Sequence, residues 1–298
     1  MNYWKKGLVI GITACSLLAG NLSAYAQSAT NVTSVYINGN PEWEAIQQQN
    51  RTYVPLAVLK DPAWSIRYEA KTKTVVISSP VQKKTIRLKQ GNKSAEVNGK
   101  AKALEEGVIM KDGRTYLPLR FVSEELNAYV GYNKEQNRVV IRTPEGQRDY
   151  ETLMGGDLTK AREIVVGLQL VYDKNDKELP VTGEGFTMTH TFPKGEALRL
   201  LRDYKDMTWY AEVNEEGLLT VKWQKSSGDK REAGVPPKPF KEAVFFSENF
   251  MAELLMYGTV DKAGVYEEAG RLDQGEAGPY QHARIVPVEG EERTDAKQ

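Results

Sequence analysis

Hydrophobic and polar positions in the first half of the chain alternate in short runs, a period that predicts β-strands with one buried face. Ala128, Val130 and Tyr132 alternate in this way, and short continuous apolar runs end the segments 74–77 and 138–141. Asn-Gly pairs at 38–39 and 98–99 predict tight hairpins, because both residues tolerate the left-handed backbone of a two-residue turn. We therefore expect antiparallel strands to dominate this half.

A segment of this half is repeated. Arg-Thr-Tyr-Val-Pro-Leu at 51–56 returns 63 positions later as Arg-Thr-Tyr-Leu-Pro-Leu at 114–119. Pro118 suits the first turn of a helix, where its missing N–H has no intrahelical partner, and apolar residues follow at helical spacing as far as Leu126. Asp-Pro at 61–62 shortens the helix of the first copy, since a residue before proline avoids the helical region. Two copies of one supersecondary unit are expected.

Three signals follow in order within the second copy. They are Lys-Ser-Ala-Glu-Val-Asn-Gly at 93–99, Asp-Gly-Arg-Thr-Tyr-Leu-Pro-Leu-Arg-Phe-Val at 112–122, and the closing strands at 132–141. This series resembles the copper amine oxidase N-terminal-like domain, or stalk domain, over roughly residues 33–143. The resemblance implies an α+β domain with an antiparallel sheet wrapped around a helix. In that family the domain is non-catalytic and occurs on extracytoplasmic proteins of Gram-positive bacteria.

The oxidase chemistry itself is not expected. The chain has two histidines, His190 and His282, and one cysteine, Cys15. These residues cannot supply a three-histidine copper site or a closed Cys/His zinc site. We therefore predict no metal, no cofactor and no catalytic residues, so that the protein is not an enzyme.

The amino-terminal pattern predicts a signal peptide at 1–26. A basic start is followed by fourteen apolar residues, 7–20, and by the small-residue cleavage signal Ala24-Tyr25-Ala26. A membrane span needs about 20 apolar residues, so we expect a mature protein without one, secreted or associated with the cell wall. In the alternative reading, residues 12–15 resemble a lipobox and Cys15 anchors a lipoprotein.

Polar residues and glycines at 146–156 predict a linker. Domains are then expected at 27–145, the stalk-type domain, and at 157–288, a second α+β domain of unrecognised family. A charged tail at 289–298 is expected to fray.

The second domain carries mixed signals. Alternation with threonine at 186–192 predicts a strand, and residues 207–224 predict a hairpin. Pro193 favours a helix at 194–204, and Ser247 as an N-cap favours one at 247–257. Residues 157–166 fit either a helix capped by Asp157 or part of a β-rich run, and both readings stay open.

The 298 residues include 40 Lys and Arg and 40 Asp and Glu, so the formal charge is zero. We interpret these charges as spread along the chain, which provides no basic field for a nucleic-acid backbone. Hydrophobic residues make up 40%, enough for packed cores. Nucleic acid is therefore not an expected partner.

His190 in the second domain has acids nearby in the sequence. The acids that could orient its ring as a general base are Glu184, Glu196 and Asp203. The alternative interpretation is a structural role, in which His190 is a hydrogen-bonded histidine in a half-buried strand. Ser227 and Lys230 match a Ser-x-x-Lys pattern, but glycine and aspartate between them predict a turn.

Aromatic residues occupy both strands of the predicted hairpin, as Trp209, Tyr210 and Trp223. They could stack on a cell-wall glycan or peptide, although aromatics at strand spacing are usually core residues. The lysines at 71, 73, 83 and 84 would suit anionic wall polymers, or they could solvate a sheet edge.

These observations favour a secreted, non-catalytic, cell-envelope-associated structural or binding module. Its expected partners are a cell-wall polymer, another envelope protein, or a second copy through the N-terminal domain. The alternative is a secreted hydrolase with its active site near His190.

Overall fold

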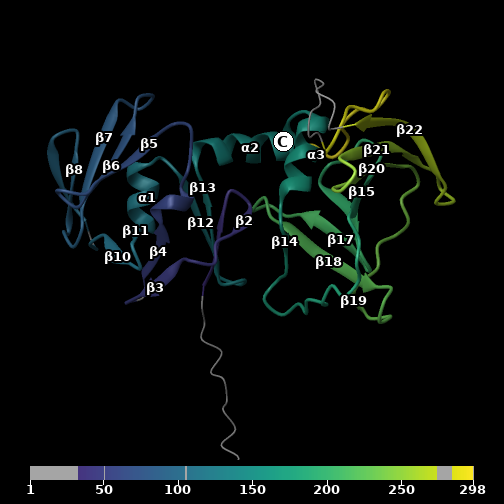
Figure 1. Cartoon of the computed structure of the whole chain (residues 1–298), viewed down its shortest axis with the longest axis horizontal. Coiled ribbons are helices and arrows are strands. Elements are labelled where there is room, and N and C mark those ends of the chain that lie inside the picture. The colour runs from purple at the N-terminus through teal and green to yellow at the C-terminus, as the bar shows by residue number, and fades with distance from the viewer. Residues whose placement is uncertain (1–32, 50, 105, 274–283, 298) are drawn as a thin grey trace, which may run out of the picture. The chain divides into compact units, whose positions relative to one another are not determined.

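The computed structural model describes residues 33–49, 51–104, 106–273 and 284–297 (Figure 1). The predicted signal peptide, with Cys15, and His282 lie outside the described residues. Three α-helices and four β-sheets make this part of the chain α+β, as the sequence predicts. None of its helices has the length and apolar character needed to cross a lipid bilayer.

The N-terminal domain contains three of the sheets, with strand orders β12-β13-β1-β2, β10-β11-β4-β3 and β5-β6-β7-β8-β9. In the first sheet β1 pairs with β13 in parallel; the other pairs are antiparallel. The strands are β1 Ser34–Ile37, β2 Asn40–Pro41, β3 Ile46–Gln48, β4 Arg51–Pro55, β5 Ser65–Glu69, β6 Thr74–Ser79, β7 Lys84–Lys89, β8 Ser94–Val97, β9 Lys100–Ala103, β10 Ile109–Lys111, β11 Arg114–Pro118, β12 Tyr129–Asn133 and β13 Arg138–Arg142.

The two Arg-Thr-Tyr segments lie side by side as β4 and β11. Leu117 is opposite Val54 and Pro118 is opposite Tyr53. After β11 the chain forms helix α1, Leu119–Glu125, whereas after β4 it forms only the 3-10 turn η1, Leu56–Val58. The short first helix agrees with the prediction made from the Asp-Pro pair.

The core of this domain lies between the sheets and α1. Val54 and Leu117 of the paired strands are fully buried, and Phe121 and Val122 of α1 pack into the same cluster. Strands β6, β7 and β13 contribute Ile77, Leu88 and Ile141, among others, to the cluster.

The segment predicted as a linker is helical instead. Helix α2, Pro144–Gly155, begins at Thr143, whose hydroxyl accepts a hydrogen bond from the Gly146 N–H at 3.2 Å. An N-cap threonine followed by proline is a helix-start signal, which the polar composition concealed. The open alternative at 157–166 resolves as helix α3, Leu158–Gly167, with Asp157 accepting from the Lys160 N–H at 2.9 Å.

The C-terminal domain is one large sheet of order β14-β18-β17-β16-β15-β20-β21-β22, with β19 paired to β18. Helices α2 and α3 pack on one face, where Leu153 and Val165 meet Phe192, Leu200 and Phe246. The strands are β14 Leu170–Val171, β15 Thr187–Pro193, β16 Arg199–Tyr204, β17 Met207–Val213, β18 Leu219–Ser226, β19 Glu232–Gly234, β20 Ala243–Asn249, β21 Leu254–Val260 and β22 Tyr266–Asp273.

The predicted strand at 186–192 and hairpin at 207–224 are confirmed, but both helices predicted in this domain are wrong. After Pro193 the chain makes a tight turn, with Glu196 N–H donating to the Pro193 carbonyl at 3.0 Å, and returns as β16. Ser247 does not cap a helix; its hydroxyl lies 2.9 Å from the Thr189 hydroxyl on the neighbouring strand.

The charged C-terminal segment is bound to the domain, so the expectation of a frayed tail is wrong. Arg293 donates to the carbonyls of Thr152 and Gly156 at 3.1 and 2.7 Å, around the end of α2. Asp295 accepts from the backbone N–H groups of Ala197 and Leu198 at 2.7 and 2.6 Å. The charges pair with backbone groups that would otherwise lack partners.

Side chains of β13 connect the two domains. Arg138, with its side chain 6% exposed, pairs with Asp173 at 3.0 Å and with Glu216, to which its Nε donates at 2.7 Å. Tyr36, Val140, Val171 and Leu218 form a buried apolar cluster beside it.

Candidate functional site

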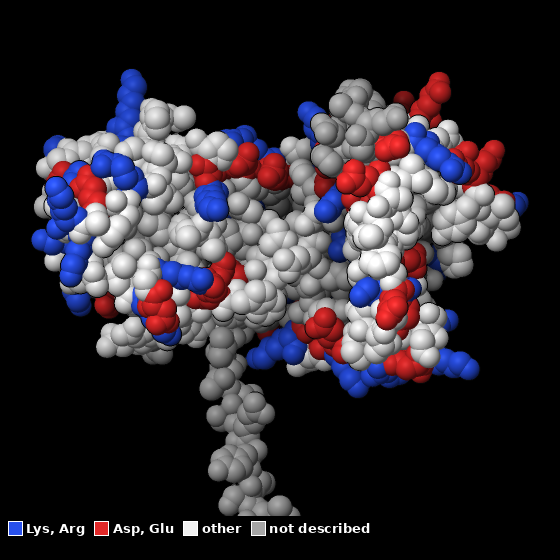
Figure 2. All heavy atoms as spheres, viewed as in Figure 1, with Lys and Arg blue, Asp and Glu red and all other residues white. Residues whose placement is uncertain are grey.

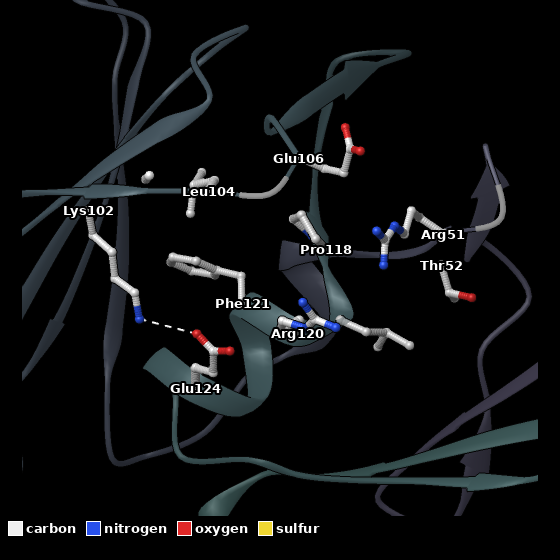
Figure 3. A pocket seen from close by; sticks show the side chains of 11 residues that line it. Arg51, Thr52, Lys102, Leu104, Glu106, Pro118, Arg120, Phe121 and Glu124 are labelled. Atoms are coloured by element: carbon white, nitrogen blue, oxygen red, sulfur yellow. Dashed lines mark hydrogen bonds and ion pairs between the residues drawn. The ribbon is translucent and has the colours of Figure 1, made fainter.

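A pocket of about 390 Å³ opens in the N-terminal domain where β4, β9 and α1 approach one another (Figure 3). Its charged lining residues are Arg51 on β4, Lys102 on β9, Glu106, and Arg120 and Glu124 on α1. Strand β4 pairs with β11, so residues of both similar segments, 51–56 and 114–119, line this pocket.

Ion pairs fix one wall of the pocket. Lys102 Nζ lies 3.2 Å from Glu124 Oε2 and also bonds to Glu125, and Lys84 Nζ lies 3.4 Å from Glu125. Burial tends to raise the pKa of Glu125, but its bonds to Lys102 and Lys84 outweigh burial and the pKa is lowered. The hydrogen bonds to Glu125 and Glu124 raise the pKa of Lys102. Glu125 and Lys102 therefore stay charged near neutral pH, and their bond holds α1 against β9.

The remaining lining is apolar. Phe121 is 5% exposed and belongs to the domain core, and half-buried Leu104, Pro118 and Leu119 lie around it. A pocket with an apolar wall and a few convergent charged groups is typical of a binding site. Charges of both signs suit a molecule that carries carboxylate and ammonium groups together.

A shallower pocket of about 360 Å³ is lined by residues 43–46 and by Lys111, Asp112, Arg114 and Tyr116 of the β10–β11 hairpin. Arg114, which matches Arg51 in the repeated segment, pairs there with Glu44. Trp43 on its rim is 84% exposed.

The three aromatic residues predicted as ligand contacts do not share one face of the sheet. Trp209 is 6% exposed, packs with Met207 and donates its Nε1 hydrogen to the Tyr172 hydroxyl at 3.1 Å. Tyr210 points to the opposite face, where Trp223 is its cross-strand neighbour. Tyr210 is buried, and Trp223 is half-buried beside a groove of about 350 Å³. Their role as ligand contacts stays a prediction.

His190 is 2% exposed and lies in the sheet, facing the helices with Arg202 as its cross-strand neighbour. Its Nε2 has no hydrogen-bond partner among the described residues. Of the acids predicted to orient it, Glu196 pairs with Arg199, and Asp203 accepts from the Thr208 hydroxyl at 2.5 Å. The structure thus does not bring these two acids to the histidine.

The described residues contain no group of three His, Cys, Asp or Glu side chains placed to hold a metal ion. His190 is enclosed by sheet and helix residues, and His282 lies outside the described part. The side chains that the structure describes therefore do not fit a copper centre.

Sequence reasoning missed the charged residues of the pocket. Arg51 and Arg120 belong to the repeated segments, where they mark the repeat and give no sign of a binding site. Arg120 nevertheless occupies the position of Ala57 in the first copy. That difference between the copies was the available signal. Lys102 and Glu124 meet only through the tertiary fold, so no local pattern could pair them.

Comparison with known families agrees with the resemblance in the first half. Residues 33–141 match the family model of the copper amine oxidase N-terminal domain, a non-catalytic stalk-like domain, and this match covers only part of the chain. No curated protein matches the chain.

Proposed function

We propose that the protein is a secreted, non-catalytic binding module of the cell envelope, and that its N-terminal domain holds a short ligand segment in the pocket between β4, β9 and α1. The single observation that carries the proposal is the pocket itself, with charges of both signs beside an apolar wall. The match of residues 33–141 to a non-catalytic domain family supports a binding role. The export signal at 1–26 supports secretion.

The ligand that suits this lining is a short peptide of the cell wall. Such a peptide carries carboxylate and ammonium groups next to small apolar side chains. The charged side chains of the lining would contact these carboxylate and ammonium groups. Phe121 would contact the apolar portion.

We also infer that the domain consists of two copies of one unit whose sheets wrap around α1. The antiparallel pairing of β4 with β11 supports this, since it sets equivalent segments side by side. Arg114, which matches Arg51 in the repeated segment, also lines a pocket and pairs there with Glu44, which supports the same inference.

The test fills the pocket without touching the core. Ala103 is exposed, lies on the edge strand β9 and lines the pocket, so Ala103→Trp should block it. Ala101→Trp is the matched control, because Ala101 is exposed on the same face of β9 and does not line the pocket. Purified protein is sedimented with peptidoglycan from which anionic polymers have been stripped.

We expect the wild type and Ala101→Trp to sediment with the peptidoglycan, and Ala103→Trp to lose at least tenfold of this retention. Equal retention of all three proteins, or none for the wild type, would refute the proposed pocket function.

A further inference from the structure

One sheet of the N-terminal domain concentrates positive charge. Residues 65–103, which form β5 to β9, contain ten Lys and Arg against two Asp and Glu, whereas the rest of the chain contains thirty against thirty-eight. The zero net charge therefore conceals a strong local excess, and the expectation of evenly spread charge is wrong. Figure 2 shows Lys and Arg side chains gathered along the side where Figure 1 places β6, β7 and β8. We call β5–β9 the basic sheet.

Half of these ten cations have no acidic partner within ion-pair distance among the residues the structure describes. The paired cations are Arg67, Lys84, Arg87, Lys93 and Lys102. Glu69 serves two of them, Arg67 at 2.9 Å and Arg87 at 2.7 Å. The five lysines without such a partner are all exposed, and they are Lys71, Lys73, Lys83, Lys89 and Lys100.

These five lysines lie at both ends of the strands. Lys71 and Lys73 in the β5–β6 turn, with Lys89, are at one end, because the Gln90 N–H donates to the Lys73 carbonyl at 3.3 Å. Lys83 and Lys100 are at the other end, where the Asn98 side chain bonds to the Lys83 carbonyl. Strand β6 has six residues, so about 20 Å separates the two ends.

Protection of a sheet edge does not explain this placement. The edge strands of the basic sheet are β5 and β9, yet Lys83 and Lys89 flank the central strand β7. Arg87 and Arg67 lie in register with Val76 between the two ends, on the face away from the core. Glu69 pairs with both arginines and Glu96 is opposite Arg87, so the unpaired positive charge lies in two groups of lysines at the two ends of the strands.

We propose that this face of the basic sheet binds an extended anionic polymer of the cell wall with a phosphodiester backbone. A small anion can neutralise the lysines of one end only, whereas an extended chain can contact the lysines of both ends. The inference rests on the proposed envelope location and adds a second ligand, distinct from the peptide in the pocket.

The test uses turn positions where the substitution favours the fold. Lys73 and Lys83 adopt φ of 51° and 49°, a left-handed backbone that asparagine tolerates better than lysine and that Asn137 adopts in the β12–β13 turn. The test variant is Lys71→Gln/Lys73→Asn/Lys83→Asn. The matched control, Lys238→Gln/Lys241→Gln/Lys262→Gln, removes three exposed lysines of the C-terminal domain and changes the net charge equally.

Binding of the full chain to immobilised synthetic poly(glycerol phosphate) is measured across a salt series, with inorganic phosphate as a competitor. We expect the wild type to bind with an affinity that falls with salt, and the test variant to bind at least tenfold more weakly with a shallower salt dependence. The control should stay within twofold of the wild type, and inorganic phosphate should compete poorly. An unchanged melting temperature of the test variant shows that its fold is intact.

Equal loss in both triple variants would show that net charge alone drives adsorption, and no loss in the test variant would remove the basic sheet from binding. Either outcome overturns the inference. Because the pocket is tested on peptidoglycan without anionic polymers, retention there together with no polymer binding refutes this inference alone. Polymer binding without retention on stripped peptidoglycan refutes the pocket alone.

Discussion

Arg162 and Glu291 form a buried ion pair with two parallel hydrogen bonds, Nη1 to Oε2 at 2.7 Å and Nη2 to Oε1 at 2.9 Å. Their side chains are 2% and 3% exposed. Arg162 also donates to the Glu196 carbonyl at 2.8 Å, and Glu291 accepts from the Gly195 N–H at 2.9 Å. The pair therefore joins α3, the β15–β16 turn and the C-terminal segment at one point.

Removing the carboxylate of Glu291 should destabilise the folded protein. In Glu291→Gln the guanidinium of Arg162 remains buried without a countercharge, and we expect the free energy of unfolding to fall by about 3 kcal/mol. Urea unfolding measures it. The neighbouring, exposed Glu292→Gln should change it by less than about 0.5 kcal/mol. Similar values for the two variants would show that the pair contributes nothing to stability.

Gly195 makes a second prediction about the same turn. Its φ is +76°, and a Cβ added to it would lie 2.5 Å from the Glu292 carbonyl oxygen. Gly264 has φ +79° and open space around the same position, so Gly264→Ala should cost about 1 kcal/mol from backbone strain alone. We expect Gly195→Ala to cost clearly more, because the C-terminal segment must also move. Equal melting temperatures of the two variants would contradict the close approach.

His190 should make the protein sensitive to mild acid. Burial, together with the charges of Arg202 and Arg284, holds the pKa of His190 well below its ordinary value of 6.5. The unfolded chain then binds a proton below pH 6.5 that the folded protein does not, so stability falls as the pH drops from 6.5 toward the folded pKa. The slope contributed is at most about 1.4 kcal/mol per pH unit.

Urea unfolding from pH 7.5 to 5 measures this slope. His190→Leu should flatten it, since no imidazole remains to be protonated in the unfolded chain. An imidazole resonance that is absent from His190→Leu and titrates near pH 6.5 in the folded wild type would show that His190 is accessible to protons and would refute the prediction.

Arg142 links the two domains by stacking. Its guanidinium carbon lies 3.9 Å from the ring centroids of both Tyr129 and Tyr150. Its Nε donates to Gln147 Oε1 at 2.8 Å, and its Nη1 to the Glu216 carbonyl at 3.2 Å. Arg142→Ala should lower the free energy of unfolding by about 2–3 kcal/mol, with Arg142→Lys in between, because an ammonium group cannot stack as a plane.

Differential scanning calorimetry measures this loss of stability. The control is Arg271→Ala at an exposed position, which should change the free energy of unfolding little. The contacts across β13 predict one cooperative transition for the wild type and two for Arg142→Ala. A single, unshifted transition for the variant would show that the stacking does not couple the domains.

The sequence predicts several strands of the N-terminal domain because some hairpins there have a local signal, such as Asn38-Gly39 or Asn98-Gly99. It fails at 194–204 because Leu198 and Leu201 lie at helical spacing. The alternation that decides the strand includes Arg202, whose guanidinium is buried beneath α3 and donates to the Leu168 carbonyl at 3.2 Å. A buried arginine is read as a surface residue when its partner is a distant backbone carbonyl.

The sequence does not predict the pocket for a related reason, although it already indicates Lys71, Lys73, Lys83 and Lys84 as candidates for binding anionic polymers. The pairing of Lys102 with Glu124 depends on the approach of β9 to α1, which no motif specifies. A local count of charges reveals the positive excess of the basic sheet. In the net charge of the whole chain, acidic residues elsewhere cancel this excess. The charges at 289–298 indicate a tail exposed to solvent. In the structure, however, Arg293 donates to a carbonyl at the end of α2 and Asp295 accepts from a backbone N–H after Gly195.

The register of β1 against β13 sets Ser34 opposite Arg138, a separation of 104 residues in the chain. Strand β1 is synthesised first but can pair only after β13 has been synthesised. The entropy cost of closing this long loop must be overcome before the β1–β13 pairing stabilises the domain. During synthesis or export, the amino-terminal segment should remain open to chaperones and proteases until residue 142 has emerged, and the domain should then assemble in one slow step.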